Sequence, residues 1–380
     1  MKEPSKRVTP DRASAEQPRS VCLVGLIAGG HSGVPRYAAK LADAIDRASA
    51  SYPALRLSLL TTLAGAEAIA PRSLPVRTVG GARRSVNAGP GRLLLEHVAI
   101  RGDRADLLHY FDLTGPVLAP GRPFVTTIHD MAPLYGFRKL QNTYKRRLFP
   151  WALARATAGV AVSGFAKNEA VEHLGVDPRK IQVVHSGPGL TADTPPASSP
   201  PEPDHPFVLY VGNLSTNKNL PMLIRAFHRT DAPVRLVLAG RPREGAAEIR
   251  QAVAGGRRAD EIDLREDPSD EVVDGLYRAA VALLLPSTYE GFGFTPLEAM
   301  ARGCPVLASD IPALREIAGD GALLLPPRDE SSWSEAIERV VGDDPLRKDL
   351  RSRGAATVQK YSWDATARGV LDLFGSLTLR

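Results

Sequence analysis

The chain has 380 residues, 43% of them hydrophobic, which is more than one core usually organises and predicts two domains. Its two cysteines, Cys22 and Cys304, stand in separate halves and exclude a disulfide framework, while a net charge of +6 favours an anionic partner without identifying it. No run of eighteen apolar residues and no signal-peptide core occur, so we expect a cytoplasmic protein.

Residues 1–19 are polar and lack periodicity, which predicts a disordered tail. An apolar run, a glycine-containing loop and a helical pattern then follow one another from residue 20, as at the start of a βαβ unit. Short apolar runs recur further along with helical segments between several of them, and this alternation predicts a parallel sheet. These runs are 55–60, 107–111, 124–128, 157–162 and 181–184.

The stretch 191–206 is rich in Pro, Ser and Asp and predicts an interdomain linker. The alternation of strands and helices then restarts, so we expect two Rossmann-like domains, 20–190 and 207–360. The expected elements are strands at 207–211, 234–238 and 281–285 and helices at 219–229 and 246–254.

The segment 283–309 has the pattern strand, loop, helix, strand. Thr295 is a good helix N-cap, and Pro296 suits the first helical position. A helix N-terminus presents unpaired backbone donors that can hold a diphosphate, and the glycines at 291 and 293 allow the backbone to approach a ligand closely. An alternative is structural, because Thr295 and Glu298 also have the spacing of a capping box.

The residues EGFGFTPLEAMARGCPVLAS, 290–309, resemble the Glu-x7-Glu segment of glycosyltransferase family four, which contains retaining enzymes of the GT-B architecture. The likeness continues through 312–329 and, more weakly, spans nearly all of 20–375. It implies an α/β fold of two Rossmann-like domains whose parallel sheets face a central cleft. It also implies that a C-terminal helix at 361–380 packs back on the first domain.

This resemblance implies roles for the residues of the segment. Glu298 would hold the ribose hydroxyls of a nucleotide diphosphate sugar, and Glu290 would face the donor sugar. Backbone amides would hold sugar hydroxyls and phosphate oxygens. These amides belong to Phe292, Gly293, Phe294 and Thr295.

The residues YVGNLSTNKNL, 210–220, also resemble a family segment. Lys218 would lie on the diphosphate, where an ammonium stabilises the charge of the leaving group; a solvated loop lysine is the alternative. The commonest family pattern has an arginine where this chain has Asn213 and Asn217. Asn213 stays a candidate donor-binding residue, and Arg241, after the next expected strand, is the candidate for the missing cation.

In the first domain, Gly33 matches the glycine of a family loop, and its amide would approach the donor phosphate or the acceptor. The segment TIHDMAPL, 127–134, resembles the family's His-Asp segment, so His129 would lie near the transferred sugar. Asp130 would orient that loop or the acceptor. A hydrogen-bonded scaffold histidine is the alternative, although a position just past an apolar strand favours the cleft.

The resemblance therefore implies a retaining hexosyltransferase, with some likeness to mannosyl- and deoxysugar-transferring enzymes. It would move a sugar from a nucleotide diphosphate to a hydroxyl of a glycan, a lipid-linked saccharide or a small molecule, by attack on the same face and without a protein nucleophile. No DxD motif occurs, so we expect neither a bridging metal nor another cofactor. Cations and backbone dipoles would stabilise the leaving diphosphate instead.

Two other functions are left open. A nucleotide-sugar epimerase of the same architecture would bind the same donor but need no acceptor. Basic residues scattered among Leu and Pro suggest a protein that binds nucleic acid or a membrane surface. No aromatic side chains are interleaved with them as a platform for bases, so we expect no nucleic acid as a partner. Peripheral contact with the inner membrane face stays an alternative. These basic residues are Arg83, Arg84, Arg92, Arg101, Arg104, Lys145, Arg146 and Arg147.

Overall fold

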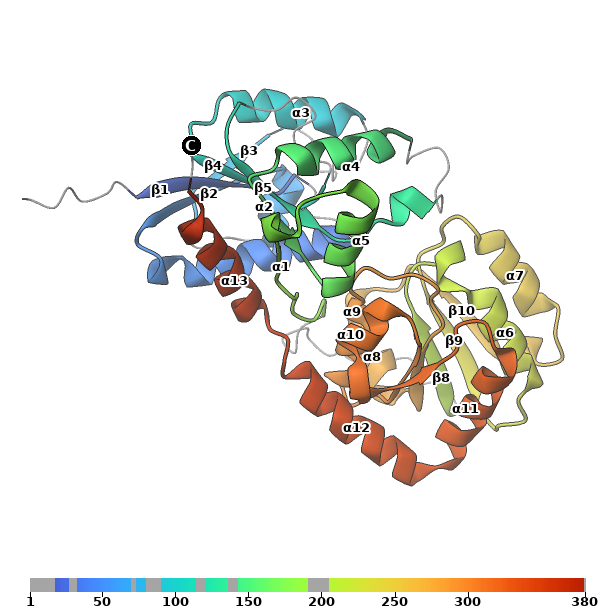
Figure 1. Ribbon diagram of the computed structural model, residues 1–380. Helices are drawn as coiled ribbons and strands as arrows, with labels where there is room; N and C mark the ends of the chain where they lie inside the picture. Colours follow the sequence, from blue (N-terminus) through green and yellow to red (C-terminus); the bar gives the residue numbers. More distant parts are fainter. Residues whose placement is uncertain are drawn as a thin grey trace, which may run out of the picture.

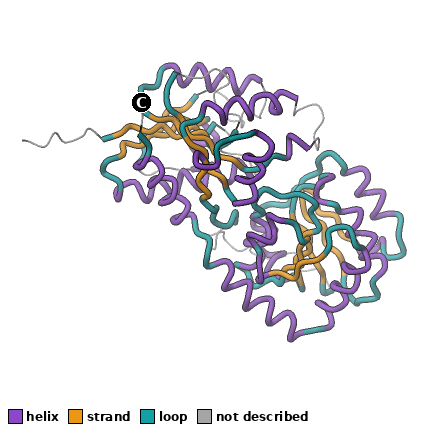
Figure 2. Tube along the Cα trace, in the orientation of Figure 1, coloured by secondary structure: helices purple, strands orange, loops and turns teal. Residues whose placement is uncertain are grey.

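The computed structural model describes residues 18–26, 33–69, 73–79, 90–113, 121–135, 143–190 and 205–378. Two lobes, each a parallel sheet surrounded by helices, make up the molecule (Figures 1 and 2). The expected α/β class with two parallel sheets is confirmed. Most of the expected tail and linker, residues 1–17 and 191–204, lies outside the described residues, as do Arg83 and Arg84.

The N-terminal lobe is built on a seven-stranded sheet in the order β3-β2-β1-β4-β5-β6-β7, and all neighbouring strands are parallel. Its central strands are buried throughout, which is why they appear in the sequence as uninterrupted apolar runs. The strands are β1 (Arg19–Val24), β2 (Leu55–Thr61), β3 (Val76–Thr78), β4 (Leu107–Tyr110), β5 (Phe124–Ile128), β6 (Ala158–Ala161) and β7 (Ile181–Val183).

Helices of the N-terminal lobe follow from helical spacing and from caps. The first helix, α1, buries a face in which Tyr37, Leu41 and Ile45 recur every fourth residue. The helix α5 begins where Ser163 Oγ accepts a hydrogen bond from the amide of Ala166 at 3.0 Å. The helices are α1 (Gly33–Ala48), α2 (Leu63–Ile69), α3 (Pro90–Arg101), α4 (Thr143–Arg155), α5 (Gly164–Leu174) and the 3-10 helices η1 (Ser49–Ser51), η2 (Ala132–Tyr135) and η3 (Pro178–Lys180).

The C-terminal lobe is built on a six-stranded parallel sheet in the order β10-β9-β8-β11-β12-β13. Its strands are β8 (Phe207–Val211), β9 (Arg235–Gly240), β10 (Ile262–Glu266), β11 (Ala282–Leu285), β12 (Val306–Ser309) and β13 (Ala322–Leu325). Its helices are α6 (Leu220–Arg229), α7 (Ala246–Ala254), α8 (Asp270–Ala279), α9 (Phe294–Met300), α10 (Pro312–Ile317), α11 (Glu330–Gly342) and α12 (Asp344–Val358), with η4 (Thr216–Lys218), η5 (Ala259–Glu261) and η6 (Gly319–Gly321).

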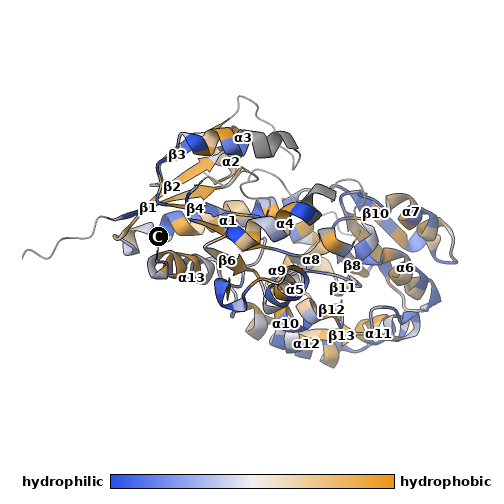
Figure 3. Ribbon diagram, turned by 45° about the horizontal axis from the view of Figure 1, so that its top comes forward, coloured by the Kyte–Doolittle hydropathy of each residue, from blue (hydrophilic) through white to orange (hydrophobic). Residues whose placement is uncertain are grey.

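The strand order of both sheets reverses beside their first strand. In the N-terminal sheet β1 lies between β2 and β4, and in the C-terminal sheet β8 lies between β9 and β11. Open parallel sheets bind ligands at such switch points, outside the carboxyl ends of the strands. Hydrophobic residues concentrate in the strands and hydrophilic residues on the outer helices and loops (Figure 3). The loops that follow the strands are therefore available to form a site.

The last helix, α13 (Trp363–Ser376), returns to the N-terminal lobe and packs against α1 (Figure 1). The indole of Trp363 donates a hydrogen bond to the carbonyl of Pro188 at 2.8 Å and stacks edge-on with Tyr37. Phe374 is fully buried against His109. Among the described residues, no helix is both long and apolar enough to cross a membrane.

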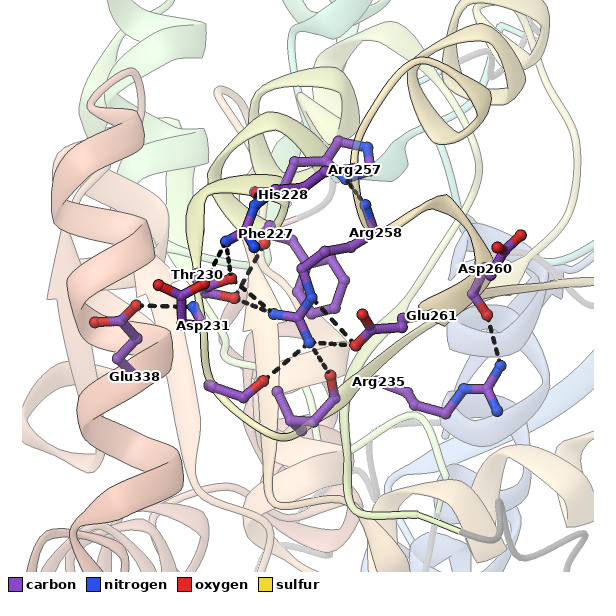
Figure 4. Close-up of polar contacts among 12 residues, drawn as sticks. Phe227, His228, Thr230, Asp231, Arg235, Arg257, Arg258, Asp260, Glu261 and Glu338 are labelled. Atoms are coloured by element: carbon purple, nitrogen blue, oxygen red, sulfur yellow. Dashed lines mark hydrogen bonds and ion pairs between the residues drawn. The ribbon is translucent and has the colours of Figure 1, made fainter.

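A buried arginine stabilises the turn that follows α6 (Figure 4). The guanidinium of Arg258, which is 5% exposed, donates to the carbonyls of Thr230, Ala232 and Val234 at 3.1, 2.9 and 2.7 Å. The same group lies over the ring of Phe227, 4.2 Å from its centroid. Because protein atoms already satisfy these donors, we assign Arg258 to the stability of the C-terminal lobe.

Candidate active site

A cleft of about 820 Å³ opens between residues of the two lobes, at the carboxyl ends of the strands. All twelve residues predicted to form the site line this cleft, although they come from segments far apart in the chain. From the N-terminal lobe these are Gly33, His129 and Asp130, and from the C-terminal lobe Asn213, Lys218, Arg241, Glu290, Phe292, Gly293, Phe294, Thr295 and Glu298.

Lys218 and Glu290 form an ion pair in the cleft. The neighbouring strands β8 and β11 bring them together, since Lys218 ends η4 after β8 and Glu290 lies in the loop after β11. Ser287 Oγ donates a further hydrogen bond to Glu290 Oε1 at 2.7 Å. The side chains of Lys218 and Glu290 are only 15% and 12% exposed, so a cation and a carboxylate face one another in a poorly hydrated place.

Gly291, in the loop before α9, lies directly on the N-terminal lobe. A Cβ on Gly291 would be 2.0 Å from the carbonyl oxygen of His129, a distance that no other residue could accommodate without displacement. Gly291 also accepts a hydrogen bond from Ser163 Oγ at 2.6 Å. The loop is therefore a fixed part of the contact between the lobes.

The start of α9 differs from the sequence-based expectation. Gly293, with a φ of 89°, occupies the N-cap position and Phe294 is the first helical residue, so the expectation of Thr295 as N-cap and Pro296 as first residue is wrong. The left-handed backbone at Gly293 places the turn into the helix two residues earlier than the Thr-Pro pair indicated. The residues of this loop nevertheless line the cleft.

Glu298 is almost completely buried, with 3% exposure, and does not form the capping box with Thr295. Its Oε1 accepts hydrogen bonds from the amide of Leu190 at 2.9 Å and from Arg36 at 3.3 Å, while Oε2 accepts one from Tyr277 at 2.9 Å. A carboxylate offers about four acceptor positions, so one position is left for a ligand hydroxyl.

His129 lies just past β5 and packs edge-on against Tyr37, 4.6 Å between ring centroids. Its Nε2 is 2.7 Å from the carbonyl oxygen of Phe111. A carbonyl only accepts, so Nε2 carries the hydrogen and Nδ1 of the neutral ring is an acceptor. Burial lowers the pKa of His129 and outweighs the opposing effects of the Phe111 carbonyl and nearby aspartates, which favours this neutral form. Asp130 accepts a hydrogen bond from the amide of Ala132 at 2.9 Å and so stabilises the turn into η2.

Arg241 makes a two-pronged contact with Asp267, with N–O distances of 2.9 and 3.1 Å. These residues follow β9 and β10, on the side of the C-terminal sheet away from β11. Asn213 accepts a hydrogen bond from Tyr210 with its backbone carbonyl at 2.8 Å. Arg241 and the Lys218–Glu290 pair therefore follow different strands along the C-terminal sheet.

Sequence reasoning missed the residues that join the two lobes at the cleft. Tyr289, directly before Glu290, donates to Glu169 Oε2 at 2.5 Å and accepts a hydrogen bond from the amide of Met131 at 2.8 Å. Arg36 on α1 reaches Glu298, and the only signal for it was its position one helical turn beyond Gly33. Glu169 had no such signal.

Another contact between the lobes involves Glu316 of α10. Its carboxylate accepts hydrogen bonds from the amides of Gly164 and Phe165, at 2.7 and 2.9 Å, and from His185 at 2.8 Å. Burial alone would raise the pKa of Glu316, but these hydrogen bonds outweigh it and the pKa is lowered. The start of α5 is thus held by a carboxylate of the opposite lobe.

Comparison with known proteins agrees with this geometry. The family model described as Glycosyltransferase Family 4 matches residues 31–188, and the one described as Glycosyl transferases group 1 matches residues 193–357. The O-antigen chain mannosyltransferase RfbU of Salmonella typhimurium is 30% identical over 241 residues, which are 63% of this chain and 65% of that protein. The match thus spans slightly less than two thirds of the relative's length.

Solved structures share the fold at low identity. The sucrose-phosphate synthase from Thermosynechococcus elongatus superposes with a TM-score of 0.72 at 21% identity, covering 94% of this chain and 99% of the other. Anabaena HepE, in complex with UDP and glucose, superposes with a TM-score of 0.70 at 18% identity, covering 94% of this chain and 100% of the other. The expected GT-B fold is confirmed, and with family models matching both lobes the chain belongs to glycosyltransferase family four, a family of sugar-transferring enzymes.

Proposed function

We propose that this protein transfers a hexosyl group from a nucleotide diphosphate sugar, bound in the cleft, to a hydroxyl of a saccharide acceptor. The observation that carries the proposal is the meeting of Lys218, Glu290 and Glu298 with His129 in one cleft between two parallel sheets. The structures of HepE with UDP and with UDP-glucose support a nucleotide sugar as the donor. The name of RfbU supports a mannosyl donor and a glycan acceptor.

In this proposal the nucleotide lies along the C-terminal lobe. Glu298 receives a ribose hydroxyl at its remaining acceptor position, and Lys218 lies beside the diphosphate. When the bond between sugar and diphosphate breaks, negative charge grows on the departing phosphate oxygen. The Lys218 ammonium, held in a poorly hydrated place, and the amides before α9 stabilise that charge without reorganising.

The sugar lies between the two lobes. Glu290, which Ser287 and Lys218 already hold, accepts hydrogen bonds from sugar hydroxyls, and His129 accepts one at Nδ1. We assign neither of them as a nucleophile. A phosphate oxygen takes the acceptor proton on the face from which the diphosphate leaves, and the sugar keeps its anomeric configuration. The contacts between the lobes exclude water and so limit hydrolysis of the donor.

Binding of the donor is the first test. We expect one of UDP, GDP, ADP or dTDP to stabilise the protein in a thermal-shift panel, since a ligand at a hundred times its dissociation constant adds about 2.7 kcal/mol. The matching nucleotide sugar should then release nucleotide only when a saccharide acceptor is present. Conversion of the donor to an isomeric sugar without acceptor would instead identify an epimerase.

The site assignment is tested in the same assay. Lys218→Ala and Glu298→Ala should each reduce transfer by roughly a hundredfold or more while remaining folded. Lys348→Ala is the matched control, because Lys348 is 74% exposed on α12 and contacts only a surface aspartate in the described structure. Transfer should also persist in EDTA. Near-normal turnover of Lys218→Ala, or loss in EDTA that Mg²⁺ or Mn²⁺ restores, contradicts the proposed scheme.

A further inference from the structure

An arginine of the N-terminal lobe reaches across the cleft to the carboxylate that we assign to the ribose. Arg36 Nη1 lies 3.3 Å from Glu298 Oε1, and Arg36 Nη2 lies 2.6 Å from Oδ1 of Asp270, the first residue of α8. The side chains of Arg36 and Glu298 are 19% and 4% exposed. One guanidinium therefore links three elements, α1, α8 and α9, at this end of the cleft.

The loop after β7 packs against Arg36 and Glu298 and restricts the positions of both side chains. A Cβ on Gly189 would lie 2.2 Å from Glu298 Oε1 and 3.1 Å from Arg36 Cδ, so the backbone of the loop rests directly on both side chains. The next residue, Leu190, donates its amide hydrogen to the same oxygen. With Oε1 occupied from two directions, the carboxylate has one orientation, and its remaining acceptor position is on Oε2.

The same loop carries a hydroxyl that has no hydrogen-bond partner among the described residues. Ser186 is fully buried and lines the cleft, and its Oγ makes no hydrogen bond with any residue that the structure describes. A buried polar group without a partner destabilises the folded protein, because it has lost its hydrogen bonds to water. A ligand that enters the cleft and bonds to Ser186 Oγ would remove this cost.

We propose that the N-terminal lobe completes the nucleotide end of the donor site, with Arg36 positioning Glu298 for the ribose and Ser186 binding the nucleotide through its hydroxyl. This inference rests on the proposed function. Arg36 acts through Glu298, so it is a positioning residue. Since both lobes contribute to one site, the nucleotide binds fully only when the lobes are together.

The ligand is the nucleotide diphosphate that stabilises the wild-type protein in the thermal-shift panel. Its dissociation constant is measured by calorimetry for the wild type, Arg36→Met, Arg36→Lys and Ser186→Ala. Loss of a charge-assisted hydrogen bond should raise the constant roughly tenfold to a hundredfold in Arg36→Met, and loss of a neutral one roughly twofold to tenfold in Ser186→Ala. Arg36→Lys keeps the charge but not the two-pronged geometry, so its constant should lie between those of the wild type and Arg36→Met.

Steady-state kinetics separate positioning from a general structural effect. The donor KM of the Arg36 variants should rise with the dissociation constant, while kcat at saturating donor and the acceptor KM stay within about threefold of the wild type, since Lys218 and Glu290 are unchanged. Arg47→Met is the control: it lies on the same helix, is 43% exposed and pairs with Asp43 and Asp364. It should leave nucleotide binding unchanged.

The outcomes are distinct. If the wild-type protein binds no nucleotide diphosphate, the proposed function fails and this inference fails with it. If the wild type binds a nucleotide diphosphate and Arg36→Met binds it equally well, only this inference is overturned. If Arg36→Met does not fold, the same comparison is made with Arg36→Lys. A fall in kcat as large as the fall in kcat/KM also overturns it.

Discussion

Glu290 lies in the loop after β11, and the phenol of the preceding residue, Tyr289, hydrogen-bonds this loop to the N-terminal lobe. It donates to Glu169 at 2.5 Å and accepts from the amide of Met131 at 2.8 Å, and its residue is only 9% exposed. Met131 lies two residues after His129, so this hydroxyl links two segments of the site. Tyr289→Phe removes the hydroxyl oxygen and retains the ring.

The size of the effect follows from the two bonds that are lost. A carboxylate oxygen of Glu169 and the amide of Met131, both in buried surroundings, would each lack one partner, at a cost of about 1–3 kcal/mol apiece. Tyr135 continues to donate to the other oxygen of Glu169, which limits the loss. We expect a net cost of about 2 kcal/mol to the assembled site, which corresponds to roughly a thirtyfold decrease in kcat/KM.

The assay compares kcat/KM for donor and acceptor in the wild type, Tyr289→Phe and Tyr52→Phe. Tyr52 is the control because its hydroxyl also donates to a carboxylate, that of Asp372 at 2.8 Å, but on the surface between α13 and the end of η1. Thermal denaturation verifies that each variant is folded. If Tyr289→Phe keeps the wild-type kcat/KM, the hydroxyl does not hold the site together and the reasoning is refuted.

Three further predictions concern stability. Arg258→Met should lower the free energy of unfolding of the C-terminal lobe in urea by about 3–5 kcal/mol, whereas its exposed neighbour Arg257→Met should cost under about 1 kcal/mol; similar losses would contradict the assignment. Trp363→Ala should cost about 3–5 kcal/mol and expose α13 to limited proteolysis, and unchanged protection would show that this indole does not anchor the helix. Folding lowers the pKa of Glu316, so its stabilising contribution is complete above the ordinary carboxyl pKa and is lost as the pH falls through the lower pKa of the folded state. Glu316→Gln should therefore reduce the acid-induced loss of stability below about pH 4.5, the ordinary carboxyl pKa, and a stability curve parallel to that of the wild type would refute this.

Strands in the middle of a sheet were predictable because they are buried on both faces. The expected runs 124–128 and 207–211 have the same bounds as β5 and β8, which consist almost wholly of buried residues. The strands β3, β10 and β13 were not predicted. All three are edge strands, and β10 alternates apolar with charged residues in the sequence IDLRE, so it lacks the uninterrupted apolar run of a central strand.

The residue types of the candidate site were available from a local motif, but their partners were not. Arg241 lies in the cleft, as expected for a cation near the diphosphate, but its pairing with Asp267 had no local signal. The N-cap of α9 was misplaced because Thr-Pro is a good local signal, whereas the left-handed backbone of Gly293 determines where the helix begins. These differences arise where contacts between segments compete with local preference.

A chain segment of a few residues carries its own periodicity, and this was enough to predict two parallel sheets. The resemblance of short segments to glycosyltransferase family four then indicated the family and twelve residues of the cleft. The pairing of Arg36 with Glu298, 262 residues apart, and of Tyr289 with Glu169 depends on how the two lobes pack. Such contacts have no local signature, because the free energy that selects them comes from burying both partners together and not from either segment alone.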